Sequence, residues 1–179
     1  MSLGLNAWIS QSIISFTENS CENTLARFHE KAWDKPLVGF SSGDDKLYDF
    51  YKRDIGSFYL TPKEFLEGTY PDRVFPAEEI SVISWVLPHT EKTKEEQRKE
   101  TLLPTERAAL SRSDGEEFNR RIAEHLVSLL EKEGYPAVSP CCPRYGRFIC
   151  RKSMRTHPTG PNDIRPMFAA WEPSASPIR

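Results

Sequence analysis

Residues Ile80 to Leu87 read ISVISWVL, and this stretch is the strongest strand signal in the chain. It is rich in β-branched and aromatic residues, which suit the pleated surface of a sheet, and Pro88 stops it because proline cannot donate to a strand ladder. We therefore predict a strand in the centre of a sheet. A compact apolar run, PLVGF at residues 36–40, is closed by the turn-forming SSGDD and predicts a second, buried strand.

Helical patterns flank these two segments. Apolar residues recur close to helical spacing over residues 5–16 and again over residues 46–55, so each segment predicts an amphipathic helix. Thr61 and Glu64 form a T-x-x-E capping box with proline at the first helical position, which predicts the start of a short helix that ends near Gly68.

The last helix has its own start and stop signals. Ser113 and Glu116 make a second capping box, and Gly134 supplies a C-cap. The face between them is apolar and consists of Phe118, Ile122, Leu126, Leu129 and Leu130. Before this helix, residues 91–100 have almost no apolar side chain and predict a solvated helix or excursion. After it, residues 135–138 are predicted to return as a strand.

Strands alternating with helices predict an α/β fold with an incomplete sheet flanked by helices. The composition changes after Pro140, since the remaining residues contain no Leu and no Val but hold three of the four Cys in the chain. Such a stretch cannot bury enough apolar surface to offset the entropy lost on ordering. We therefore predict a folded body over residues 1–140 and a disordered tail over residues 141–179.

Composition and charge narrow the classes of function. The chain is 38% hydrophobic and 28% charged, as in soluble domains, and its net charge is −2. The tail carries more basic than acidic residues, so the body is acidic, which argues against a nucleic-acid partner. The N-terminus lacks the features of an export signal, and no apolar run approaches the roughly 18 residues of a membrane span. We predict a cytoplasmic protein with no membrane partner and a reduced Cys21.

No catalytic constellation emerges from the residue types. Asp44 and Asp45 after Gly43 suit a cation site or an acid and base pair, but adjacent acids after glycine more often cap a turn or helix. His89 follows a strand and a proline, where α/β folds often place site residues. A solvent-facing loop histidine is the simpler interpretation.

The other residues with ligand chemistry have equally plain interpretations. His29 and His125 fall on helical stretches with no second ligand at metal spacing. Trp33 and Trp85 abut strand candidates and are predicted to be core aromatics. Cys141, Cys142 and Cys150 have the spacing C-C-x7-C, which fits neither the paired cysteines of zinc sites nor the ferredoxin pattern. We therefore assign no catalytic, cofactor-binding or metal-binding residue.

Three runs of the body resemble a known family. They are AWDKPLVGFSSGDDKLYDFYKRDIGSFYLTPKEFLEG (32–68), ISVISWVLPHTEKTKEEQRKE (80–100) and DGEEFNRRIAEHLVSLLEKEGYPAVSP (114–140). Together they resemble the N-terminal region of epoxyqueuosine-reductase-like 4Fe-4S proteins, relatives of reductive dehalogenases. In full-length members, the resemblance implies a cobalamin-binding α/β domain, a ferredoxin-like segment with 4Fe-4S clusters, and a reductive reaction. The family's catalytic acid, cobalamin contacts and cluster cysteines lie beyond the matching residues.

The tail departs from this family. After the matching part, members should continue into W-S-E-R-H and then G-L-G-T-F-G-L, and neither run is present. A shifted reading frame joins the third base of each tail codon to the first two bases of the next codon. In this frame, the codons of residues 141–143 permit M-L-S, and those of residues 157–164 permit S-N-W-S-E-R-H. Residues 165–178 permit a run that contains G-L-G-T-F-G-L. We therefore predict that residues 141–179 are an out-of-frame tail on a truncated member of the family.

Two functions follow as hypotheses. The first is a fragment of an iron-sulfur, cobalamin-dependent reductase, inactive by itself because the catalytic, cobalamin and cluster segments are absent, so that no cofactor is expected in this chain. The alternative is a non-catalytic binding or interaction module that uses an open sheet edge and the basic tail. An open edge also favours self-association.

Overall fold

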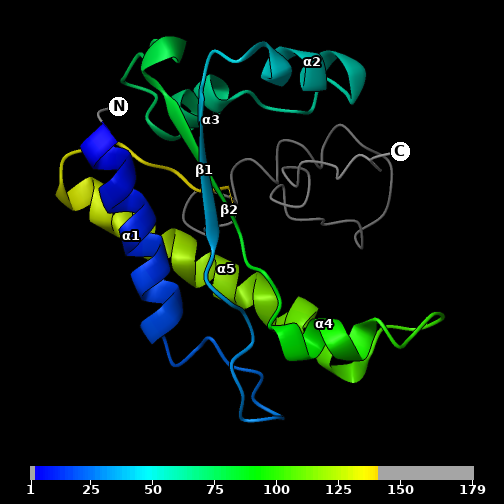
Figure 1. Cartoon of the computed structure of the whole chain (residues 1–179). Coiled ribbons are helices and arrows are strands. Elements are labelled where there is room, and N and C mark those ends of the chain that lie inside the picture. Colours follow the sequence, from blue (N-terminus) through cyan, green and yellow to red (C-terminus); the bar gives the residue numbers. More distant parts are fainter. Residues whose placement is uncertain (1–2, 141–179) are drawn as a thin grey trace. The chain divides into compact units, whose positions relative to one another are not determined.

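The computed structural model describes residues 3–140, and Figure 1 shows their helices and strands. The helices are α1 (Leu3–Asn19), α2 (Lys46–Asp54), α3 (Pro62–Thr69), α4 (Glu91–Gln97) and α5 (Glu106–Lys132), the strands are β1 (Leu37–Ser42) and β2 (Ser81–Val86), and Ala77–Glu79 forms a 3-10 turn. The two strands pair in an antiparallel sheet. The described part of the chain is therefore a mixed α/β fold, as predicted.

Both predicted strands exist, but two statements about them were wrong. Strand β1 is not buried, since Leu37 keeps 66% of its surface exposed. Strand β2 is not central, because the sheet has two strands within residues 3–140 and each strand has one neighbour there. Apolar, β-branched composition identifies a strand, but it carries no information on how many strands lie beside it.

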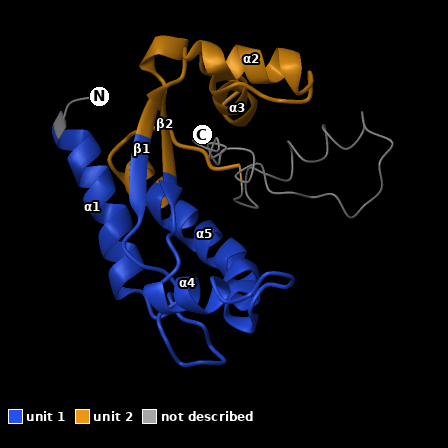
Figure 2. Ribbon diagram, turned by 45° about the vertical axis from the view of Figure 1, so that its right-hand side comes forward, with its two compact units in different colours: residues 1–39, 85–126 blue, residues 40–84, 127–179 orange. Residues whose placement is uncertain are grey.

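The chain divides into two compact units, and neither is continuous in sequence (Figure 2). Unit 1 consists of residues 1–39 and 85–126, and unit 2 consists of residues 40–84 and 127–179. Both strands and α5 therefore contribute residues to both units.

The core of unit 1 is built by α1, the segment before β1, and α5. Ile9, Ile13 and Ile122 are fully or almost fully buried. Phe118 lies between two other aromatic rings: its centroid is 5.0 Å from that of Trp33, at an interplanar angle of 7°, and 6.2 Å from that of Phe16. Stacked rings bury large apolar areas and fix their mutual geometry. The apolar face predicted for the last helix is thus confirmed as a core face at Phe118 and Ile122.

Unit 2 contains α2 and α3. The Thr61 capping box is present as predicted: the Glu64 amide donates to Thr61 Oγ1 (3.3 Å), and the Thr61 amide donates to Glu64 Oε2 (2.9 Å). The core side chains of the described part of this unit are Tyr48, Tyr59, Phe65, Leu66, Ile80, Val127, Leu130 and Ala137. The Tyr70 hydroxyl donates to the Ala137 carbonyl (3.0 Å), which ties the segment after α5 to the segment after α3.

Helix α2 forms where predicted but turns its apolar residues outward. Leu47, Phe50 and Ile55 are each between two fifths and a little over half exposed, whereas Tyr48 is buried. The helical spacing of the apolar residues therefore predicted the helix correctly. It did not predict which side of the helix faces the core.

The start predicted for the last helix was wrong. Helix α5 begins at Glu106, and Thr105 caps it, because Thr105 Oγ1 accepts a hydrogen bond from the Ala108 amide (3.2 Å). Ser113 lies inside the helix, where its hydroxyl donates to the Leu110 carbonyl (3.0 Å). The helix continues through Ser113 because every residue from Glu106 onward can adopt helical geometry and no proline intervenes.

The end of α5 is as predicted, but the strand after it was not found. Gly134 has φ +84°, its amide donates to the Glu131 carbonyl, and the Tyr135 amide donates to the Leu130 carbonyl. This pair of bonds is a Schellman motif, which needs the left-handed conformation that glycine adopts at no steric cost. Residues 135–138 do not form a strand. Their apolar character is used for packing, since Ala137 is buried.

Alanine substitutions at Thr105 and at Ser113 give a direct test of where α5 starts. Thr105→Ala is expected to lower the free energy of unfolding by about 1 kcal/mol, because it removes a cap. Ser113→Ala is expected to change it by less than about 0.5 kcal/mol, because alanine is the better helix former inside a helix. Urea denaturation followed by circular dichroism measures both. The reverse order of effects would place the helix start at Ser113.

Candidate functional site

The most unusual interior region lies where α4 meets the first turns of α5 in unit 1. Three of its side chains are polar or charged and yet almost fully buried, namely Thr93 (0% exposed), Ser111 (1%) and Arg107 (4%). Burying a polar group costs free energy unless it finds a hydrogen-bond partner. These residues therefore mark the candidate site.

The Arg107 guanidinium is the centre of this region. Its Nε lies 3.1 Å from Glu96 Oε2 on α4, and its Nη1 lies 2.8 Å from Glu30 Oε2 in the segment between α1 and β1. The guanidinium carbon lies 4.1 Å from the centroid of the Phe28 ring. Lys92 Nζ also contacts Glu30, at 2.6 Å from Oε1. We call these five residues the Arg107 cluster.

Local structure places each member. Arg107 sits in the first turn of α5, and Glu96 sits in the last turn of α4. A β-bridge between Leu25 and Glu30 forms a tight loop that holds Phe28 and Glu30 on the same short segment.

The cluster is electrically balanced, with two cations and two carboxylates. The hydrogen bond from Lys92 holds the pKa of Glu30 below its usual value, and the positive charge of Arg107 acts in the same direction, while desolvation opposes both. Glu30 is therefore ionised at neutral pH. The buried guanidinium of Arg107 has a carboxylate at two of its nitrogens and an aromatic ring on its face. Its charge is therefore already paired, and the cluster offers no unpaired charge to a substrate.

His89 lies in the same unit, three residues after the end of β2. It is half-buried, and its Nε2 is 3.5 Å from Ser111 Oγ. Burial lowers the pKa of His89, and the charge of Lys94 lowers it further. The Ser111 hydroxyl donates to the Ala108 carbonyl (3.0 Å) and is buried, so this serine does not present a nucleophile to solvent. The expectation of a solvent-facing His89 was wrong, because a β-bridge to Trp33 and the contact with Ser111 leave it half-buried.

The interpretation of Asp45 as a cap is confirmed. Its side chain accepts a hydrogen bond from the Leu47 amide (2.9 Å) at the start of α2. Trp33 is a core aromatic as predicted. Trp85 is half-buried, and its Nε1 donates to Asn119 Oδ1 on α5 (3.0 Å).

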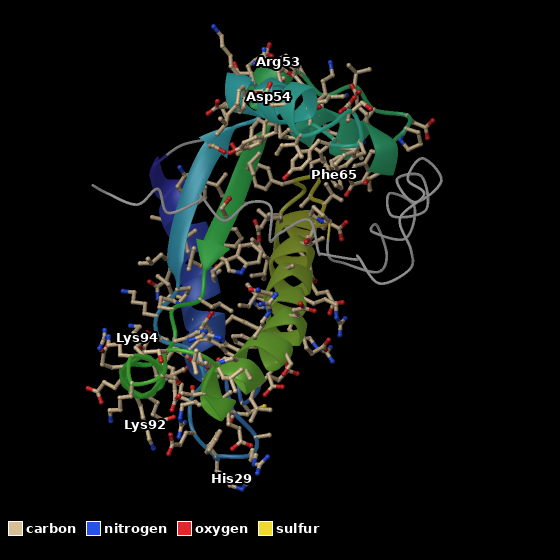
Figure 3. The ribbon with its side chains drawn as sticks, turned by 90° about the vertical axis from the view of Figure 1, so that its right-hand side faces the viewer. His29, Arg53, Asp54, Phe65, Lys92 and Lys94 are labelled. Carbon is tan, nitrogen blue, oxygen red and sulfur yellow. The ribbon has the colours of Figure 1, made fainter. Side chains whose placement is uncertain are left out.

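His29 does not lie on a helix, so that prediction was wrong. It is an exposed turn residue with φ +52°, in the loop closed by the bridge to Glu30 (Figure 3). His125 does lie on a helix, and its ring stacks on Phe16 with centroids 4.4 Å apart. Cys21 is exposed. The cysteine cluster that begins at Cys141 lies outside the described residues.

Sequence reasoning missed the Arg107 cluster. Arg107 and Glu30 lie far apart in the sequence, and no fixed sequence spacing links either of them to Glu96. The one available signal was the dense charge of residues 91–100, which also suits a wholly solvated helix.

Residues 3–140 also lack two other kinds of feature, a metal-binding group and a membrane-spanning helix. These residues contain no group of three or more His, Cys, Asp or Glu side chains placed to hold a metal ion. Nor is any helix in this range both long and apolar enough to cross a membrane. In comparisons with known proteins, no protein-family model, no curated protein and no solved structure matches the chain.

Proposed function

We propose that this chain is the N-terminal part of an iron-sulfur, cobalamin-dependent reductase of the epoxyqueuosine-reductase-like group, located in the cytoplasm and not catalytic by itself. The resemblance of three separate runs to that group is the observation that carries the proposal. These runs coincide with structural elements: residues 32–68 include β1, α2 and α3, residues 80–100 include β2 and α4, and residues 114–140 include most of α5.

The geometry supports a non-catalytic role for this part of the chain. Its most polar interior region, the Arg107 cluster, is neutral and internally paired. The described residues do not fit a 4Fe-4S cluster, because such clusters are held by several cysteine thiolates and Cys21 is the only cysteine between residues 3 and 140. We therefore assign no residue to either cofactor and derive no reaction step.

The test is to sequence the gene through the codons of Pro140 and Cys141 and several hundred bases beyond. We expect that adding or removing one base opens a frame that encodes W-S-E-R-H, G-L-G-T-F-G-L and later ferredoxin-type cysteine runs. Protein made from that corrected frame should contain iron and absorb as iron-sulfur proteins do. A gene that ends at Arg179 with no such coding downstream would overturn the proposal.

A binding module is the second candidate, and the two-stranded sheet favours it. Within residues 3–140, each strand pairs with one neighbour, so the backbone groups on its other side have no partner in the sheet. Such edges accept further strands, including those of a second copy. If the gene ends at Arg179, light scattering across a concentration series distinguishes the cases. Dimers that form with increasing concentration support the module, and a monomer at all concentrations argues against self-association.

A further inference from the structure

Helix α4 and the loop that follows it, residues 90–105, bury no apolar side chain of their own. Thr93 is the one buried residue of α4. The loop exposes the two apolar side chains at its tip, since Leu102 is 92% exposed and Leu103 is 73% exposed. We call residues 90–105 the strap. Segments with few buried apolar contacts open locally at lower free energy than the core does.

Buried polar side chains lie next to the strap in the chain. Arg107 and Ser111 are buried beside it, and His89 at its start is half-buried. By contrast, α1 and the middle of α5 bury Ile13 and Phe118 against apolar neighbours. Removing the strap would therefore expose little apolar area, and the hydrophobic effect resists its opening only weakly.

Two ion pairs link the strap to the rest of unit 1. Glu96 of the strap contacts Arg107 Nε (3.1 Å), and Lys92 of the strap contacts Glu30 Oε1 (2.6 Å). Figure 3 shows Lys92 and Lys94 projecting from α4. Arg107 and Glu30 also contact each other (2.8 Å), so both links end on one ion-paired unit, in which Arg107 is buried and Glu30 is partly exposed. The other polar contacts of the strap are largely internal: Glu91 pairs with Arg98, and Gln97 accepts from the Thr105 amide.

We propose that the strap is a conformational device that opens and closes as one piece over the Arg107 guanidinium, with the Glu96 to Arg107 pair as its latch, while the rest of unit 1 stays folded. In the open state, Arg107 keeps Glu30 but loses Glu96, so a cationic group that is buried in the closed state faces solvent. This arrangement accounts for the burial of the charged Arg107 side chain beside the strap, because a surface that is repeatedly hydrated must be polar.

Hydrogen exchange of the full chain, followed by mass spectrometry, tests the proposal. In the wild-type protein, amides of α4 are expected to exchange faster than amides of residues 118–130. Glu96→Ala should accelerate exchange in α4 by at least about tenfold, because a hydrogen bond to a charged group is lost. Exchange over residues 118–130 should not change.

Glu95→Ala is the matched control, since Glu95 is an exposed neighbour on the same helix and the same substitution is made there. It should alter exchange in α4 by less than about twofold. Arg107→Met, which removes the other end of the latch, should accelerate α4 at least as much as Glu96→Ala. Equal exchange rates for α4 and residues 118–130 in the wild type would overturn the proposal. So would a Glu96→Ala variant that leaves α4 unchanged or accelerates both regions equally.

Discussion

Replacing Phe118 by alanine is expected to lower the free energy of unfolding by about 3–5 kcal/mol, the usual cost of deleting a buried aromatic side chain. Phe118 is 2% exposed and lies between the rings of Trp33 and Phe16, which belong to two other segments. Its removal leaves a cavity that neither ring can fill without losing its own contacts. A loss of this size is comparable with the whole stability of many small domains.

Urea denaturation followed by tryptophan fluorescence and circular dichroism measures this change. Phe50→Ala is the matched control, because Phe50 is the same residue type on α2 and is 42% exposed. It should cost less than about 1 kcal/mol. Similar losses for the two variants would show that the aromatic stack is not the core of unit 1.

Asn23→Ala is expected to be the second costly substitution, at about 2–4 kcal/mol, because it leaves buried backbone groups without partners. Asn23 is buried, and its one side chain serves three backbone atoms. Nδ2 donates to the carbonyls of Thr17 (2.8 Å) and Trp33 (3.0 Å), and Oδ1 accepts from the Trp33 amide (2.9 Å). The side chain thereby joins the end of α1 to the segment before β1.

Asn19→Ala provides the comparison for this effect. Asn19 is exposed at the end of α1, and its Nδ2 donates to the Ser15 carbonyl (2.8 Å) in the same helix. Its loss should cost less than about 1 kcal/mol, because water replaces the bond. Asn23→Asp should also be destabilising, since a carboxylate cannot donate to either carbonyl. Full stability in Asn23→Ala would mean that water takes over all three bonds.

Features with local causes were predictable from the sequence. The capping box at Thr61 and Glu64, the glycine end of α5 and the strand β2 each depend on a few neighbouring residues. Asp45 was correctly interpreted as a cap for the same reason. In each case the physical cause lies within about five residues of its effect.

Features decided by distant packing were not predictable. Ser113 and Glu116 match a capping box in the sequence, and this favoured a helix start at Ser113. In the structure, Gly115 allows close approach instead, since a Cβ there would lie 3.3 Å from Cζ2 of Trp33. The close neighbour of this glycine is a ring from another segment, and no local signal reports that.

The Arg107 cluster and the outward face of α2 have the same explanation. The partners of Arg107 come from α4 and from the loop before β1, so their meeting depends on the tertiary fold. Apolar residues on α2 mark a helix but do not say which side is covered.

The discontinuous make-up of the two units bears on how the chain folds as it is synthesised. Unit 1 needs residues 1–39 together with residues 85–126, so α1 emerges from the ribosome long before Phe118, the residue whose ring stacks on Phe16. At common elongation rates this delay is roughly 5–20 s. During that time the nascent apolar face of α1 has no native cover, and transiently exposed apolar surface of this kind favours aggregation. Neither unit can be completed before α5 is made, which joins their folding into one late event.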